Sequence, residues 1–119
     1  MNNITIFVYG TLKKGYRNHR LLEGSNFIGE GRISGYDIYD LGSFPGIIGG
    51  TGEVLGELYE INQETLKRVD RLESEGYLYS RLPVEVNQKD CLIKAAAYVF
   101  NGNVHNARRI EREWRNNYD

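Results

Sequence analysis

The sequence contains little cysteine, methionine and proline, and it has no long hydrophobic run. Cys91 is the only cysteine among 119 residues, which excludes an intramolecular disulfide. Its setting, a turn leading into a strand-like segment, predicts a semi-buried and inert thiol. No stretch approaches the roughly 20 apolar residues of a transmembrane helix, and the N-terminus lacks the basic region and cleavage site of a secretory signal. We therefore expect a cytoplasmic protein with no membrane partner.

A surplus of charge is also missing. Lysine and arginine total 15, aspartate and glutamate total 16, and the formal net charge is -1. Because nucleic-acid binding needs a basic surplus to neutralise phosphates, we expect no nucleic-acid partner. His19 and His105 are the only histidines, and neither has metal-ligand spacing to another ligand. The sequence therefore predicts no metal site, and nothing in it indicates a Ser-His-Asp or Cys-His set.

Glycine and tyrosine, by contrast, are abundant, with 14 and 9 residues. Glycines suit tight turns and bulges, and tyrosines suit half-buried strands and the walls of pockets. Segment 42–50, which holds Pro45 and four glycines, is predicted to be a loop over the sheet. The pattern predicts one domain, residues 1–119, built on a small, strongly bent sheet or barrel. Six segments have strand character, namely 4–9, 27–33, 35–41, 52–61, 81–86 and 93–100.

Two helices are expected from apolar periodicity and capping residues. The first covers about residues 63–74, where Asn62 is a good N-cap and Gly76 can end the helix. The second covers about residues 106–115, and a weaker helix is expected around residues 16–22. The second helix has a thin apolar stripe, formed by Ala107, Ile110 and Trp114.

The first strand-like run ends abruptly in a glycine-bracketed basic loop, "YGTLKKG", at residues 9–15. This loop has neither the spacing of a P-loop nor that of a dinucleotide-binding fingerprint, so it gives little support for a nucleotide site. Backbone amides at the end of a buried strand can instead hold a carboxylate or a developing oxyanion. A plain turn explains the same residues equally well.

Glu73 is the carboxyl group that the helical pattern singles out. At about 100° per residue it falls between Leu66 and Val69, on or near the apolar face of the first helix. Burial would raise its pKa, as would the like charge of Asp70, and a carboxyl poised nearer neutrality suits a general acid or base. On the helical argument alone, a structural ion pair with a nearby arginine is favoured, the candidates being Arg71 and Arg81.

Four stretches together resemble the gamma-glutamylcyclotransferase-like superfamily, and its short prokaryotic members in particular. "FVYGTLKKG" resembles the opening Tyr-Gly-[Ser/Thr]-Leu loop of that family, and "FPGI" stands where a proline-containing loop is expected. "GELYEI" resembles the strand before the helix, and "VDRLESEGYLYSR" resembles the block that holds the catalytic glutamate. The first and last motifs, in this order and spacing, make the resemblance fairly specific.

The resemblance implies an α+β fold, a small bent β-barrel or mixed sheet with helices packed outside. It also implies an enzyme that needs no cofactor and no metal and that acts on a small-molecule gamma-glutamyl substrate. The α-amine of such a substrate attacks its own γ-carbonyl, and the products are 5-oxoproline and a free amine. The amine is intramolecular and has a high effective concentration, so the protein needs only to fold the substrate and move protons.

The resemblance also implies roles for individual residues. Glu73 would take the proton of the substrate ammonium and pass it to the leaving amine. Tyr79 would line the pocket, and so would Tyr98. The gamma-glutamyl group would be held by the opening loop, residues Tyr9, Gly10, Thr11 and Leu12.

The chain departs from the family pattern after the glutamate, where the family usually has glycine directly. Here Ser74 and Glu75 come first and Gly76 follows, so Glu75 is a second candidate for the catalytic position. The distance onward to Tyr79 and the inward phase of the helix favour Glu73. Two other functions stay open: a non-catalytic small-molecule binding module, and removal of a gamma-glutamyl cap from a biosynthetic intermediate. The sequence does not indicate an oligomeric state.

Overall fold

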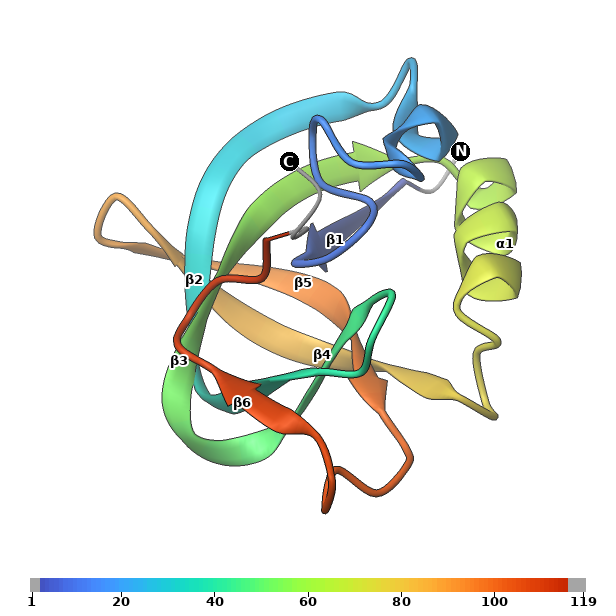
Figure 1. The fold of residues 1–119 in the computed structure, drawn as a ribbon. Coiled ribbons are helices and arrows are strands. Elements are labelled where there is room, and N and C mark those ends of the chain that lie inside the picture. The colour runs from blue at the N-terminus through green and yellow to red at the C-terminus, as the bar shows by residue number, and fades with distance from the viewer. Residues whose placement is uncertain (1–2, 116–119) are drawn as a thin grey trace.

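A computed structural model describes residues 3–115 of the chain. In chain order, the described residues form β1 (Ile4–Val8), the short 3-10 helix η1 (His19–Leu22), β2 (Asn26–Asp40), β3 (Pro45–Ile61), α1 (Gln63–Leu72), β4 (Tyr79–Gln88), β5 (Cys91–Phe100) and β6 (Arg108–Ile110). Figure 1 shows a strongly curved sheet with α1 on its outside. The structure therefore has the α+β class that the resemblance implies.

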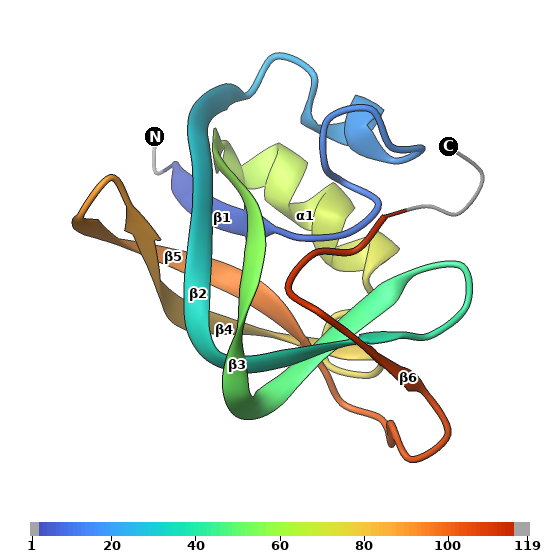
Figure 2. The same ribbon diagram turned by 60° about the vertical axis from the view of Figure 1, so that its left-hand side comes forward.

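The six strands of the described chain form one mixed sheet in the order β3-β1-β5-β4-β2-β6, and β2 also pairs with β3. The pairings therefore run in a closed circuit through the first five strands. The pairing between β2 and β4 is short, because it consists of a single pair of residues, Arg32 and Asn87. The parallel contact between β1 and β5 is also a single pair, Ile6 with Ala96. The result is a bent mixed sheet rather than a regular barrel (Figure 2).

The bend is concentrated in the long hairpin of β2 and β3. The pairing register of β2 shifts between Phe27 and Gly29 and again between Ser34 and Tyr36. Gly29 has a φ of 142° and Gly35 a φ of 86°, values that residues with a Cβ rarely adopt. The two strands expected at 27–33 and 35–41 are thus one continuous strand with glycine bulges, which lets β2 curve around the core.

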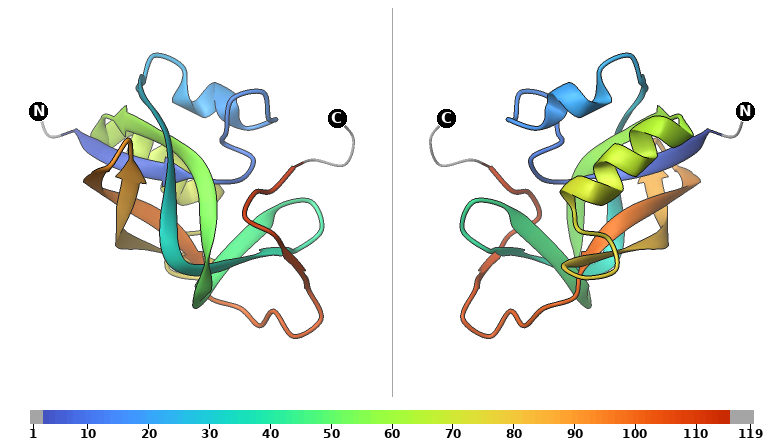
Figure 3. Two further views of the ribbon diagram at one scale, coloured as in Figure 1. Left: turned by 90° about the vertical axis from the view of Figure 1, so that its left-hand side faces the viewer. Right: turned by 90° about the vertical axis from the view of Figure 1, so that its right-hand side faces the viewer.

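Helix α1 begins and ends close to where it is expected. The Asn62 side chain accepts a hydrogen bond of 2.8 Å from the Thr65 amide and caps the first turn. The last helical residue is Leu72, and the left-handed position that follows the C-cap is taken by Ser74, with a φ of 49°. Leu66 and Val69 pack in a core cluster beneath the helix. Figure 3 shows α1 along the outside of the sheet next to β1.

Two other expectations are wrong. Segment 42–50 is only partly a loop, because β3 begins at Pro45 and pairs with β2 from there on. The helix expected at 106–115 is absent: residues 108–110 form β6, which pairs with β2. Trp114, from the expected apolar stripe, is instead packed in the core of the sheet, where it is 4% exposed. Arg112 has a left-handed φ of 72°, which an α-helix does not allow.

Smaller expectations are corrected in the same way. The weak helix around residues 16–22 is a short 3-10 turn at His19–Leu22. Cys91 begins β5 after a turn, as expected, but its side chain is exposed rather than semi-buried. A three-residue edge strand and a single turn carry too little periodicity to be recognised in the sequence.

Candidate active site

A pocket opens where β1 ends, and it contains about 340 Å³ of empty space, open solvent at its mouth included. It lies between the turn after β1, the start of β3, the end of α1 and strands β4 and β5. All residues predicted for the site line it, namely Tyr9, Gly10, Thr11, Leu12, Glu73, Tyr79 and Tyr98. The sequence motifs are far apart in the chain, and the curvature of the sheet brings them together.

The turn after β1 presents its backbone amides rather than its carbonyls. The Gly10 carbonyl accepts from the Lys13 amide at 3.1 Å, and the Thr11 carbonyl accepts from the Asn18 amide at 3.0 Å. The Leu12 carbonyl lies 2.9 Å from Nδ1 of His19. Within residues 3–115, the amides of Gly10, Thr11 and Leu12 have no hydrogen-bond acceptor. Such a set of amides can bind a carboxylate or an oxyanion.

Gly10 also lets the turn approach the far wall of the pocket. A Cβ on Gly10 would lie 2.8 Å from Cγ and 2.9 Å from Cδ of Pro45, closer than a Cβ atom comes to a non-bonded carbon in real proteins. Pro45 is itself held, because its carbonyl accepts a hydrogen bond of 2.6 Å from the Tyr79 hydroxyl. Glycine is therefore the residue that fits at this point of the turn.

Glu73 is the C-cap of α1 and lines the pocket. Burial raises the pKa of its carboxyl group from 4.5 to about 7. The like charge of Asp70, which we expected to contribute, is not among the causes. Within the described part of the chain, the Glu73 carboxyl group takes part in no ion pair. A carboxyl group with a pKa near neutrality can both accept and donate a proton.

The sequence also allowed Glu73 to form a structural ion pair with Arg81. In the structure it is Asp70, one helical turn earlier, that pairs with Arg81. One carboxylate oxygen of Asp70 contacts Nη1 of Arg81, and the other accepts a hydrogen bond of 2.6 Å from the Tyr98 hydroxyl. Glu75, the second candidate, is exposed and does not line the pocket; its carboxylate accepts a bond of 3.3 Å from the Arg81 amide.

Three tyrosines form walls of the pocket, and each hydroxyl proton is committed to a protein oxygen. Tyr9 donates to the Tyr98 carbonyl at 2.6 Å. Tyr79 donates to Pro45, and Tyr98 donates to Asp70. Burial raises the pKa of all three phenols above the ordinary value. They therefore stay neutral and shape the pocket, and Glu73 is the group in it that titrates near neutral pH.

The remaining lining residues were not singled out from the sequence, and they are Phe7, Val8, Phe44 and Pro45. Phe44 packs edge-on against Tyr79, with ring centroids 6.5 Å apart. The motif "FPGI" was a signal for the last two, but an apolar wall has no residue pattern of its own. Among the described residues, no three His, Cys, Asp or Glu side chains gather as metal ligands, and no helix is long and apolar enough to span a membrane.

The half-buried Glu73 and the turn of Gly10, Thr11 and Leu12 thus line the same pocket. The sequence profile described as "Gamma-glutamyl cyclotransferase, AIG2-like" matches residues 6–116. Among known proteins, the gamma-glutamylcyclotransferase family protein YtfP of Escherichia coli K12 is 38% identical over 76 residues, which is 64% of this chain and 67% of that protein. The chain belongs to this family of enzymes.

Two further relatives extend the likeness. The gamma-L-glutamyl-butirosin B gamma-glutamyl cyclotransferase of Niallia circulans is 32% identical over 103 residues, which is 81% of this chain and 66% of that protein. The crystal structure of a mouse AIG2-like protein superposes with a TM-score of 0.77 at 27% identity, covering 85% of this chain and 79% of that one. The bent mixed sheet is therefore the fold of this family.

Proposed function

We propose that this protein cyclises a gamma-glutamyl amine or peptide to 5-oxoproline and releases the free amine, with Glu73 carrying the proton. The observation that supports the proposal most is the surroundings of Glu73. Burial raises the pKa of its carboxyl group to about 7. The same pocket is lined by Gly10, Thr11 and Leu12, whose amides have no hydrogen-bond acceptor within residues 3–115. A carboxylate needed only for structure would have a cation beside it, as Asp70 has.

The proposed reaction uses only the substrate and this chain. The Glu73 carboxylate takes a proton from the substrate ammonium, and the resulting amine forms a bond to the γ-carbon of the same molecule. The carbonyl oxygen becomes an oxyanion, which the amides of Gly10, Thr11 and Leu12 are suited to stabilise; the same amides would suit the substrate carboxylate. The γ C–N bond then breaks as the proton on Glu73 goes to the departing amine. The ring nitrogen gives its second proton to the regenerated Glu73 carboxylate, which passes it to the released amine or to solvent.

The test is a screen of gamma-glutamyl amines and dipeptides for release of 5-oxoproline, followed by chromatography. Two matched substrates make the screen specific. An α-glutamyl isomer should be inert, because its amide is at the α-carbonyl, where attack by the α-amine cannot close a five-membered ring. An N-acetylated gamma-glutamyl amine should also be inert, because its nitrogen is no longer a nucleophilic amine. Release of the free amine from the N-acetylated compound would show that another nucleophile, such as water, attacks the γ-carbonyl, and would overturn the cyclisation.

The same assay gives a pH profile. Glu73 must be unprotonated to accept the ammonium proton, so kcat/KM should rise with pH and level off above a pKa of about 7. A flat profile across this range would exclude Glu73 as the base in the first step.

A second candidate, removal of a gamma-glutamyl cap from a biosynthetic intermediate, is favoured by one relative. The Niallia circulans protein that matches 81% of this chain acts, by its name, on a gamma-glutamylated butirosin. The bond broken would be the same, and the leaving amine would be a larger molecule. Including bulky gamma-glutamylated amines in the screen separates the two, because this candidate requires turnover on them to exceed that on dipeptides.

A further inference from the structure

Lys13 directly follows the pocket turn, residues 10–12, and its backbone and its side chain bind different parts of the chain. Its amide donates to the Gly10 carbonyl at 3.1 Å and closes the turn that carries the unsatisfied amides. Its side chain leaves the pocket and is buried, with 4% of the residue exposed. The next residue, Lys14, is exposed. Two adjacent lysines thus stand in opposite surroundings, although the sequence does not distinguish them.

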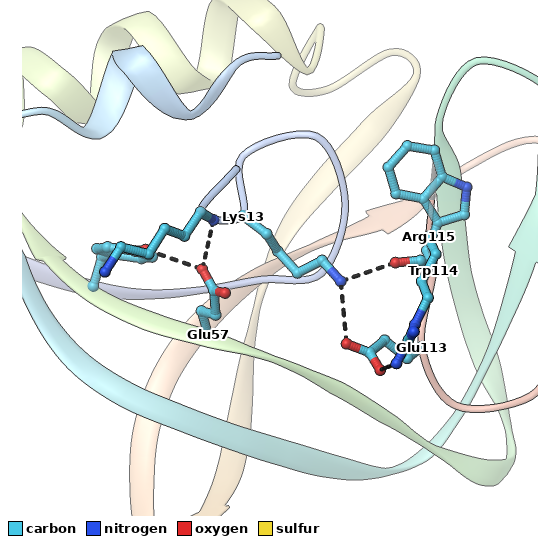
Figure 4. Close-up of polar contacts among 7 residues, drawn as sticks. Lys13, Glu57, Glu113, Trp114 and Arg115 are labelled. Carbon is cyan, nitrogen blue, oxygen red and sulfur yellow. Dashed lines mark hydrogen bonds and ion pairs between the residues drawn. The ribbon is translucent and has the colours of Figure 1, made fainter. Parts of the chain in front are cut away.

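The Lys13 ammonium binds the C-terminal segment of the described chain. Nζ donates to the Trp114 carbonyl at 2.9 Å, a residue 101 positions away, and lies 3.6 Å from Oε2 of Glu113. It also lies 5.1 Å from the centre of the Tyr16 ring. Figure 4 shows the side chain reaching across to Glu113 and Trp114, away from the turn.

The segment that receives Lys13 is itself fixed to the sheet. Trp114 is part of the core cluster, and its ring lies 5.5 Å from that of Tyr16. The Arg112 carbonyl accepts a hydrogen bond of 2.8 Å from the Leu55 amide in β3. Lys13 therefore attaches the pocket turn to a rigid point of the core rather than to a loose end.

The surroundings of the Lys13 ammonium group are not ones that favour its charge throughout. Burial lowers the pKa of Lys13 in spite of the attraction of Glu113 and Glu57, and Arg115 acts in the same direction as burial. Replacing a buried ion pair by an apolar side chain of similar size is often neutral or stabilising. We therefore expect an apolar side chain of similar length to be tolerated at position 13.

We propose that Lys13 is a positioning residue: by binding Trp114 and Glu113, it holds the turn of Gly10, Thr11 and Leu12 with its amides toward the pocket. The proposal rests on the proposed function for its effect on turnover, but not for its geometry. Since a displacement of about 1 Å in a binding group can cost about 10²-fold in rate, a loosened turn should be visible in kinetics.

The test compares Lys13→Met with the matched variant Lys14→Met. We expect Lys13→Met to shift the backbone amide resonances of Gly10, Thr11 and Leu12 in ¹⁵N–¹H spectra and to lower kcat/KM for 5-oxoproline release at least about tenfold. Its Tm should stay the same or rise. Lys14→Met should leave the resonances, the kinetic constants and the Tm close to those of the parent. The fall in kcat/KM supports the proposal whether it comes from a higher KM or from a lower kcat.

Two results would overturn it. One is a Lys13→Met protein whose three amide resonances and kcat/KM match the parent; the other is a fall in Tm with full activity in the folded fraction, which would make Lys13 purely structural. If Lys13→Met does not fold, Glu113→Gln decides by the same resonances, since Glu113 is only partly buried. If the parent releases no 5-oxoproline, the proposed function fails, and the resonance shifts alone decide on Lys13.

Discussion

The end of α1 carries two carboxyl groups one turn apart, and their surroundings are opposite. Asp70 has a cation and a phenol, since it binds Arg81 and the Tyr98 hydroxyl. Glu73 has neither within residues 3–115, and burial raises its pKa to about 7. Arg81 is paired with Asp70 and not with Glu73. Burial without a paired cation is what raises the pKa of Glu73.

The comparison predicts a division of roles. Asp70 binds Arg81 and holds Tyr98 in the pocket wall, whereas Glu73 is expected to exchange protons with the ligand.

The largest effect is expected for Glu73→Gln, which keeps the shape of the side chain and removes its proton exchange. Turnover should fall by at least about 10²-fold, the usual scale of general acid–base catalysis. The matched control is Glu75→Gln, because Glu75 lies two residues on and is exposed outside the pocket. It should stay within a few-fold of the parent. An active Glu73→Gln and an inactive Glu75→Gln would show that the catalytic position is shifted by two residues.

A somewhat smaller effect is expected for Gly10→Ala. The new methyl group would collide with the ring of Pro45, which Tyr79 holds in place, so the turn must move. We expect kcat/KM to fall about tenfold to 100-fold while Glu73 is untouched, measured with the best substrate of the screen. Gly49→Ala is the control, since nothing lies within 4 Å of its Cβ position and its φ is not left-handed. Equal activity of the two variants would contradict the role of the turn.

Asp70→Asn tests the other carboxyl group. It removes the ion pair with Arg81 but can still accept the Tyr98 hydrogen bond, so we expect a fall of only a few-fold in kcat/KM. The Tm should fall by a few degrees, because the pair is partly exposed and of moderate strength. Asp70→Asn as inactive as Glu73→Gln would mean that the two carboxylates act as one unit.

The sequence predicts best where interactions are local. The start of α1 was predictable because the Asn62 side chain binds an amide only three residues further along the chain, that of Thr65. The inward direction of Glu73 was predictable from the angle between successive residues of a helix. The lack of an ion pair at Glu73 within residues 3–115 was not predictable, because Arg81 of β4 binds Asp70 of α1 instead. The final segment was mistaken for a helix, since only its pairing with β2 and the burial of Trp114 decide its conformation.

The site shows the same limit. The turn residues were recognisable because glycine and the following motif are contiguous, and the tyrosines because their spacing matches a known pattern. The wall formed by Phe7 and Val8 was not, since the fold alone decides whether an apolar residue of a strand faces the core or the pocket. Nothing in "LKKG" tells which lysine is buried, because that depends on Trp114, 101 residues away.

The smallest effect concerns stability, and it tests the comparison without any substrate. The Glu73 carboxyl group has a pKa near 7 in the folded protein, above its ordinary value of 4.5. The folded state therefore holds the proton more tightly than the unfolded state, and stability is lost as pH rises between these two values. Glutamine at position 73 carries no such loss. The Tm of Glu73→Gln should equal that of the parent near about pH 4.5 and exceed it by a few degrees near about pH 8. Thermal unfolding of both proteins across this range measures the difference. A Glu73→Gln protein that is less stable than the parent at about pH 8 would mean that the carboxylate has a stabilising partner, and Glu73 would then resemble Asp70.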